Sequence, residues 1–246
     1  MGLANDVSSF AATIVRLGRG ISQAGADRRH EPKQLLELYD FEGCPYCRKV
    51  REVLCELDLD YRARPVAHGS PRRAELQEVG GKVQVPYLID PNTGSRLYES
   101  ADIIEYLNET YAAGHSAGWM LPVPSVLDTL VSGLATAARV GRGTRCRVSA
   151  QRALKPLTLY NMEGSPFCRK VRETLSELDL EHTIRNVPKG SRKRPELVQR
   201  GGKMQVPYLV DPNTGRELYE SDEIVAYLEE RYGPDSHARG THKHAV

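Results

Sequence analysis

The stretch EGCPYCRKVRE, residues 42–52, returns later in the chain as EGSPFCRKVRE, residues 163–173. In both places a short turn containing proline follows an apolar run and precedes a helical pattern of apolar residues. Two positions differ: Cys44 becomes Ser165, and the tyrosine becomes a phenylalanine. The window therefore indicates a strand–turn–helix unit present twice, with a thiol in one copy and a hydroxyl in the other.

The repeat extends far beyond this window. Residues 36–111 align with residues 157–232 without a gap, and GGKVQVPYLIDPNTG becomes GGKMQVPYLVDPNTG. Each copy is long enough for a compact domain, and two copies this similar must fold alike. We therefore expect one domain in residues 1–118, carrying CPYC, and a second in residues 119–246, carrying SPFC.

Each copy has the same order of expected elements, β-α-β-α-β-β-α. In the first copy, strands are expected at 35–41, 61–66, 85–90 and 95–100, and helices at 47–59, 70–81 and 100–111. Ser100 is expected to be the N-cap of the last helix. A parallel strand pair with its crossover, followed by a hairpin, predicts an α/β fold with helices on both faces of a central sheet.

An amphipathic segment precedes each copy, and the two segments are alike. Their apolar residues recur at three- and four-residue spacing: Phe10, Ile14, Leu17, Leu127, Leu130 and Leu134. Because the internal segment cannot be a cleaved presequence, both are interpreted as leader helices that pack on their own domain. With no targeting signal assigned, a cytoplasmic location is expected.

The composition gives no indication of a nucleic-acid or membrane partner. Apolar residues make up 40% of the chain, charged residues 27%, and the net charge is +2. No apolar run reaches the roughly 18 residues that a membrane span needs. Five cysteines with a single C-x-x-C pair do not supply the four ligands of a zinc site, so no metal is expected.

Three motifs occur in the same order in both copies: CPYC or SPFC at the strand-to-helix turn, VPYL at the start of a strand, and YES before the last helix. On these motifs each copy resembles a thioredoxin-fold domain of the glutaredoxin kind. It is more similar still to the N-terminal, glutathione-binding domain of glutathione transferases. The resemblance covers residues 36–111 and 157–232.

The pair Cys44 and Cys47 has the spacing of a redox-active dithiol. Cys44 lies just before a helix, where backbone N–H groups and the helix dipole favour a thiolate, and Arg48 and Lys49 add positive charge nearby. Cys47 lies one turn further on and can form a disulfide with Cys44. We expect Cys44 to attack and either Cys47 or a second glutathione to resolve; a structural cysteine pair or a relic of a former site is the alternative.

The resemblance also implies a frame for glutathione in each copy. A cis proline whose preceding residue pairs with the cysteinyl backbone of glutathione would be Pro86 after Val85, with Pro207 after Val206 as its counterpart. The Glu-Ser pair that holds the γ-glutamyl end would be Glu99 and Ser100 in the first copy. In the second copy it would be Glu220 and Ser221. The alternatives are ordinary strand-starting prolines and helix-capping serines.

Ser165 changes the chemistry expected of the second copy. An unassisted hydroxyl stays protonated at neutral pH and cannot attack a disulfide usefully. Serine-type transferases use a serine at this place to hydrogen-bond the thiolate of bound glutathione, and the resemblance implies the same for Ser165. Cys168 remains, at the position that is usually more buried. One dithiol site and one glutathione-binding site without dithiol chemistry are therefore expected.

Three functions stay open at this point. The first is a glutathione-linked thiol-disulfide oxidoreductase that acts on disulfide or glutathionylated substrates with glutathione as co-substrate. The second is a glutathione transferase in which Ser165 or Cys44 serves bound glutathione. The third is a non-enzymatic glutathione-binding or assembly module. Residues 112–154 are too few for the helical domain of a transferase, which weakens the second reading. The substrate, the oligomeric state and the packing of the two copies are not predicted.

Overall fold

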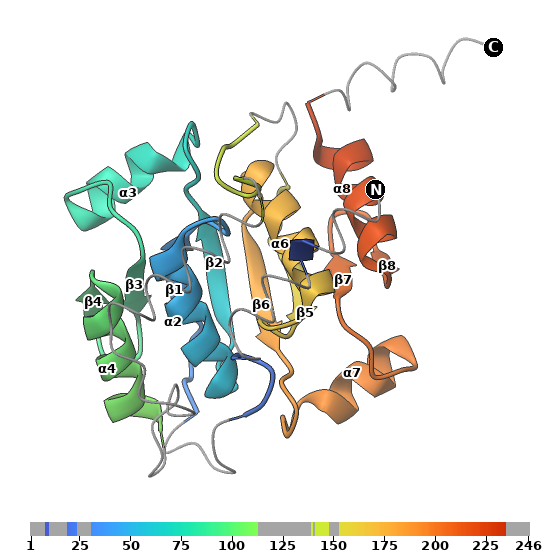
Figure 1. Cartoon of the computed structure of the whole chain (residues 1–246), viewed down its shortest axis with the longest axis horizontal. Coiled ribbons are helices and arrows are strands. Elements are labelled where there is room, and N and C mark those ends of the chain that lie inside the picture. The colour runs from blue at the N-terminus through green and yellow to red at the C-terminus, as the bar shows by residue number, and fades with distance from the viewer. Residues whose placement is uncertain are drawn as a thin grey trace.

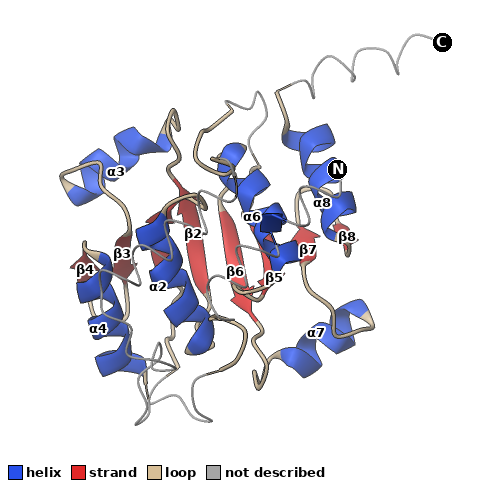
Figure 2. Cartoon of the chain, in the orientation of Figure 1, coloured by secondary structure: helices blue, strands red, loops and turns tan. Residues whose placement is uncertain are grey.

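In a computed structural model, the structure describes residues 8–9, 19–23, 31–112, 139, 141–147 and 153–234 (Figures 1 and 2). The boundary expected at residues 118 and 119 lies outside the described residues. So do the apolar residues of the expected leader helices: Phe10, Ile14, Leu17, Leu127, Leu130 and Leu134. None of the described helices is long and apolar enough to cross a membrane.

Both copies fold in the predicted order. The first copy consists of β1 (Leu36–Asp40), α2 (Pro45–Glu56), β2 (Tyr61–Pro65), α3 (Arg72–Gly80), β3 (Tyr87–Asp90), β4 (Ser95–Leu97) and α4 (Ser100–Tyr111). The second consists of β5 (Leu157–Asn161), α6 (Pro166–Glu177), β6 (His182–Asn186), α7 (Arg194–Gly201), β7 (Tyr208–Asp211), β8 (Arg216–Leu218) and α8 (Ser221–Tyr232). The α/β fold class and the order β-α-β-α-β-β-α are confirmed.

The two copies share one eight-stranded mixed sheet, ordered β4-β3-β1-β2-β6-β5-β7-β8. The junction is the antiparallel pair β2 and β6, in which Arg62 lies opposite Thr183. Within each copy the first two strands are parallel. It follows that β1 and β5 run in opposite directions. Figure 1 shows the resulting approximate two-fold arrangement, with α3 and α7 at diagonally opposite corners.

The apolar core is also continuous between the copies. A single cluster of buried residues includes Leu38 and Leu54 from the first copy and Leu159 and Leu175 from the second. On α2 the apolar residues recur at helical spacing and face the sheet, so burying them stabilises the helix against it. The shared core and shared sheet make the two copies one structural unit.

The segment before the first copy contacts the second copy. The backbone N–H of Gly20 donates to the Glu56 carboxylate of its own copy at 3.0 Å. Its carbonyl accepts from the N–H of Gly164 in the other copy at 3.1 Å. Further upstream, the Ser9 hydroxyl donates to the carbonyl of Pro166 at 2.7 Å. This segment therefore reaches the loop that contains Ser165.

The segment before the second copy repeats this arrangement. The N–H of Gly143 donates to Glu177 of its own copy at 2.8 Å, and its carbonyl accepts from Gly43 of the first copy at 3.3 Å. The described residues of these segments therefore contact the other copy in addition to their own, and the packing of the expected leader helices lies outside the described residues. Each of these segments lies across both copies, since its backbone groups find partners on either side.

Candidate functional site

Cys44 occupies the N-cap of α2, the position that the sequence predicts for a reactive thiol. Its backbone is extended (φ −78°, ψ 120°), and Pro45 takes the first helical position, where a missing N–H costs nothing. The N–H of Cys47 donates to the Cys44 sulfur at 3.3 Å. The Cys44 residue is only 5% exposed, and both cysteines are free thiols.

The surroundings of the two thiols shift their pKa values in opposite directions. The hydrogen bond from the Cys47 thiol, together with the N–H groups of Cys47 and Tyr46 and the charge of Arg51, lowers the pKa of Cys44 despite its burial. Burial raises the pKa of Cys47 well above its usual value, and the neighbouring Cys44 and Asp40 raise it further. Cys44 is therefore the thiol that ionises first, as an attacking cysteine must, and Cys47 stays protonated.

The second copy holds Ser165 in the same geometry. Ser165 is the N-cap of α6 (φ −72°, ψ 123°), and its hydroxyl oxygen accepts from the N–H of Cys168 at 3.3 Å. Burial raises the pKa of Cys168. The second copy thus places a hydroxyl where the first copy places a thiol of lowered pKa, and its remaining thiol, Cys168, resembles Cys47 in its raised pKa.

The predicted glutathione frame lies beside each of these loops. Both peptide bonds, Val85–Pro86 and Val206–Pro207, are cis as predicted. In the first copy Tyr39, near the end of β1, pairs with Tyr87 at the start of β3, so Pro86 lies at the sheet end where the Cys44 loop begins. The equivalent pairing of Tyr160 with Tyr208 places Pro207 in the same way.

The Glu-Ser pair reaches the same end of the sheet, because β4 runs antiparallel to β3. Glu99, not Ser100, is the N-cap of α4, so the predicted cap position is wrong by one residue. Ser100 instead opens the helix. Glu220 and Ser221 have the same arrangement at α8. The capping glutamates leave their side chains exposed beside a helix N-terminus, the kind of position that binds carboxylates.

Both glutamates have an unusual backbone conformation. Glu99 has φ 60° and ψ 122°, and Glu220 has φ 61° and ψ 115°, although positive φ is uncommon outside glycine. Their carboxylates accept from the side-chain amides of Gln84 at 2.5 Å and Gln205 at 2.6 Å. Strained residues of this kind cluster at functional sites. Sequence reasoning missed the two glutamines, although each precedes the Val-Pro motif directly.

Residues outside the predicted set also shape the first site. Arg51 supplies charge to Cys44, whereas sequence reasoning assigned that role to Arg48 and Lys49. Tyr46, beside Cys44, remains 48% exposed, and its counterpart Phe167 remains 43% exposed. These aromatic side chains offer an apolar surface to a substrate at either loop.

The two candidate sites are separate. Since β1 and β5 run in opposite directions, the loops that follow them lie at opposite ends of the shared sheet. Each loop lies at the same end of the sheet as the cis proline and the Glu-Ser pair of its own copy, and at the opposite end from those of the other copy. Among the described residues, no group of three or more His, Cys, Asp or Glu side chains could hold a metal ion.

The family profile "Glutathione S-transferase, N-terminal domain" matches residues 38–115 and again residues 159–236, together more than half of the chain. The chain belongs to this family. Each matched range contains one complete set of the features described above: the N-cap loop, the cis proline and the Glu-Ser pair. The chain is thus a tandem of two glutathione S-transferase N-terminal domains.

Individual relatives agree with this assignment. Glutathione S-transferase-like protein tpcF of Aspergillus fumigatus is 39% identical over 82 residues, which cover 33% of this chain and 36% of that protein. Glutathione S-transferase-like protein gedE of Aspergillus terreus is 34% identical over 74 residues, 30% of this chain and 33% of that protein. The matches thus span about a third of each Aspergillus protein.

A solved structure of Leishmania TDR1, described as a unique trimeric glutathione transferase, also matches. It is 16% identical, with a TM-score of 0.30, over 80% of this chain and 66% of that one.

Proposed function

We propose that this tandem protein is a glutathione-dependent enzyme of the glutathione transferase type, and that each copy binds glutathione. Membership of the family carries the proposal, since both copies keep the N-cap Cys or Ser, the cis proline and the Glu-Ser pair. The comparisons favour this transferase reading over the oxidoreductase that the sequence analysis placed first.

The chemistry proposed for the second copy is thiolate activation. Glutathione would lie along the backbone of Val206, with its γ-glutamyl carboxylate at the N-terminus of α8. Its sulfur would then reach Ser165, whose hydroxyl and the first N–H groups of α6 stabilise the thiolate. The thiol proton goes to solvent, the sulfur forms a bond to an electrophilic carbon, and the leaving group departs with its electron pair.

A second function is proposed for the first copy, because its two thiols are separated in pKa. The Cys44 thiolate would attack the glutathione-side sulfur of a glutathionylated substrate and form a mixed disulfide with glutathione. The substrate sulfur leaves as a thiolate. A second glutathione thiolate then attacks the sulfur of the bound glutathione, which forms oxidised glutathione and releases the Cys44 thiolate. Alternatively the Cys47 thiol, after loss of its proton, attacks the Cys44 sulfur, which forms a Cys44–Cys47 disulfide and releases glutathione as a thiolate; two further glutathione molecules then reduce that disulfide.

Two assays on the full-length chain separate these functions. One measures conjugation of glutathione to 1-chloro-2,4-dinitrobenzene, and the other measures glutathione-dependent reduction of a glutathionylated peptide. The proposal predicts that Ser165→Ala lowers conjugation and that Cys44→Ser removes disulfide reduction. Absence of both activities from the wild-type chain would contradict the enzymatic proposal and favour a binding or assembly module.

A further inference from the structure

The loop that carries Cys44 is held by Arg51 of its own copy and also by residues outside that copy. Between Phe41, which follows β1, and the nucleophile there are only two residues, Glu42 and Gly43. Both are buried, and both contact the second copy or the segment that precedes it. The position of Cys44 relative to the N-terminus of α2 therefore depends on these contacts.

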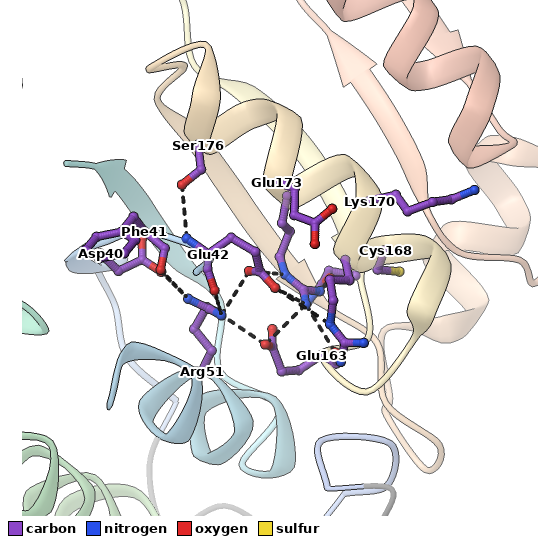
Figure 3. A network of polar contacts seen from close by, with 12 residues as sticks. Asp40, Phe41, Glu42, Arg51, Glu163, Cys168, Lys170, Glu173 and Ser176 are labelled. Atoms are coloured by element: carbon purple, nitrogen blue, oxygen red, sulfur yellow. Dashed lines mark hydrogen bonds and ion pairs between the residues drawn. The ribbon is translucent and has the colours of Figure 1, made fainter. Parts of the chain in front are cut away.

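Glu42 is hydrogen-bonded to two residues of α6 in the second copy (Figure 3). Its two carboxylate oxygens accept from the Arg172 guanidinium at 3.0 and 3.2 Å, and its N–H donates to the Ser176 hydroxyl at 3.1 Å. Burial opposes ionisation, but the charges of Arg172 and Arg51 hold the pKa of Glu42 at about 2. The carboxylate is therefore charged at neutral pH, and bidentate pairing fixes its orientation.

Gly43 is covered by the segment that precedes the second copy. Its N–H donates to the carbonyl of Gly143 at 3.3 Å. A Cβ atom at Gly43 would lie 2.2 Å from a methyl carbon of Thr144 and 3.1 Å from the carbonyl oxygen of Arg142. A side chain at this position would collide with the Thr144 methyl group, because the segment before the second copy packs directly on Gly43.

Equivalent contacts, related by the approximate two-fold arrangement of the copies, occur around the Ser165 loop. The N–H of Glu163 donates to the Cys55 sulfur at 3.4 Å, where Cys55 is the counterpart of Ser176. Arg51 pairs with Glu163 at 3.2 Å, as Arg172 does with Glu42 (Figure 3). Gly20 covers Gly164 as Gly143 covers Gly43. Residues of each copy, and of the segment before it, thus contact the N-cap loop of the other copy, which carries Cys44 or Ser165.

We infer that Arg172, Ser176 and Gly143, all outside the first copy, are positioning residues for the Cys44 thiol. They act through Glu42 and Gly43 and do not touch the sulfur themselves. The second copy then serves the first as part of its active site, in addition to any glutathione that it binds. This inference rests on the proposed thiol chemistry of Cys44.

Two glycine substitutions form a matched test. A Cβ at Gly143 would lie 2.8 Å from the Cβ of Glu42, and a Cβ at Gly20 would lie 2.8 Å from the Cβ of Glu163; their φ angles are 69° and 71°. Gly143→Ala and Gly20→Ala therefore impose comparable strain, but the first displaces Glu42 of the Cys44 loop whereas the second displaces Glu163 of the Ser165 loop.

The readout is the rate at which iodoacetamide alkylates Cys44 in the full chain, followed by peptide mass spectrometry from pH 5 to pH 10. For Gly143→Ala the midpoint should move up by about one pH unit, which slows alkylation about tenfold at pH values below the wild-type midpoint. Gly20→Ala should keep the wild-type midpoint. Equal shifts in both variants, or none in either, would overturn the inference.

A second pair of substitutions, which causes no steric clash, tests the inference if the Gly143→Ala variant does not fold. Ser176→Ala removes the acceptor of the Glu42 N–H, and Cys55→Ala removes the acceptor of the Glu163 N–H. Only Ser176→Ala should raise the midpoint for Cys44, and an unchanged midpoint there would overturn the inference. A wild-type midpoint at the ordinary value for cysteine would instead count against the thiol chemistry itself.

Discussion

At the scale of single residues, the two copies differ most at the helix N-cap. Cys44 and Ser165 have nearly the same backbone angles, and each accepts the N–H of the residue three positions later. The environment is therefore shared, and the atom presented to a ligand is sulfur in one copy and oxygen in the other. A thiolate can attack sulfur, whereas a hydroxyl can only donate to it.

The first prediction compares the two thiols of the first copy. Cys44→Ser should abolish reduction of a glutathionylated peptide, because the remaining Cys47 thiol is buried and protonated. Cys47→Ser should keep a glutathione-dependent part of the activity, since a second glutathione can resolve the mixed disulfide. Rates are measured in the full chain, with Cys168→Ser as the matched control, which should leave them unchanged. Full activity in Cys44→Ser would refute this assignment.

A second prediction concerns the hydroxyl of the second copy. Ser165→Ala should raise the pKa of glutathione bound there, because one hydrogen bond to a charged group is worth roughly 1.5–3 kcal/mol. The ultraviolet absorbance of the bound thiolate, titrated against pH in a Cys44→Ala background that has neither a thiol nor a hydroxyl at the first site, measures this. An identical titration curve in the presence and absence of the Ser165 hydroxyl would exclude its role.

At the scale of secondary structure, most elements were predictable and a few boundaries were not. The strand and helix periodicities and the PNTG turn predict the whole order of elements. The N-cap of α4 was misplaced because serine is a strong capping residue, whereas the structure uses Glu99 in a backbone conformation that sequence patterns do not reveal. The local partner of Glu99, Gln84, was missed for the same reason.

The third prediction tests this conformation. Glu99→Gly and Glu99→Ala both remove the hydrogen bond with Gln84, but only glycine tolerates positive φ without strain. In urea denaturation the glycine variant should be more stable than the alanine variant by about 1 kcal/mol. Both variants should bind glutathione more weakly than wild type. Equal stability of the two variants would show that the backbone at this position is unstrained.

At the scale of the whole molecule, the sequence predicts two domains but does not predict that they share one sheet and one core. β2 and β6 would be edge strands in isolated copies, and nothing local to either strand reveals that they pair with each other. Arg51 and Arg172 lie on helix positions where a sequence suggests solvated charge, yet both are buried between the copies. Each pairs with one carboxylate of the other copy as well as with carboxylates of its own copy, and no pattern within one repeat reveals the partner in the other copy.

The fourth prediction uses His182, which lies at the β2–β6 junction. Burial lowers its pKa to about 4, and in the unfolded chain the value is about 6.5. The unfolded state therefore binds more protons between these values, so the free energy of unfolding should fall as the pH decreases from about 6.5 to 4. The loss attributable to His182 is up to about 3 kcal/mol.

The matching experiment compares wild type with His182→Asn in urea at a series of pH values. Carboxylates elsewhere titrate in both proteins, so the difference between the two curves isolates the histidine. That difference should shrink or reverse towards pH 4. Parallel curves over the whole range would mean that His182 has the same pKa in the folded and unfolded chain.

The central claim is that both copies of this transferase-type tandem bind glutathione. Isothermal titration of glutathione into the reduced, full-length chain tests it most directly, because the leaders contact both copies and a fragment would lack part of each site. We predict two glutathione molecules per chain, and one in a variant whose second frame is disrupted by Glu220→Ala with Ser221→Ala. Absence of binding at millimolar glutathione, or saturation at one molecule in both proteins, would contradict the claim.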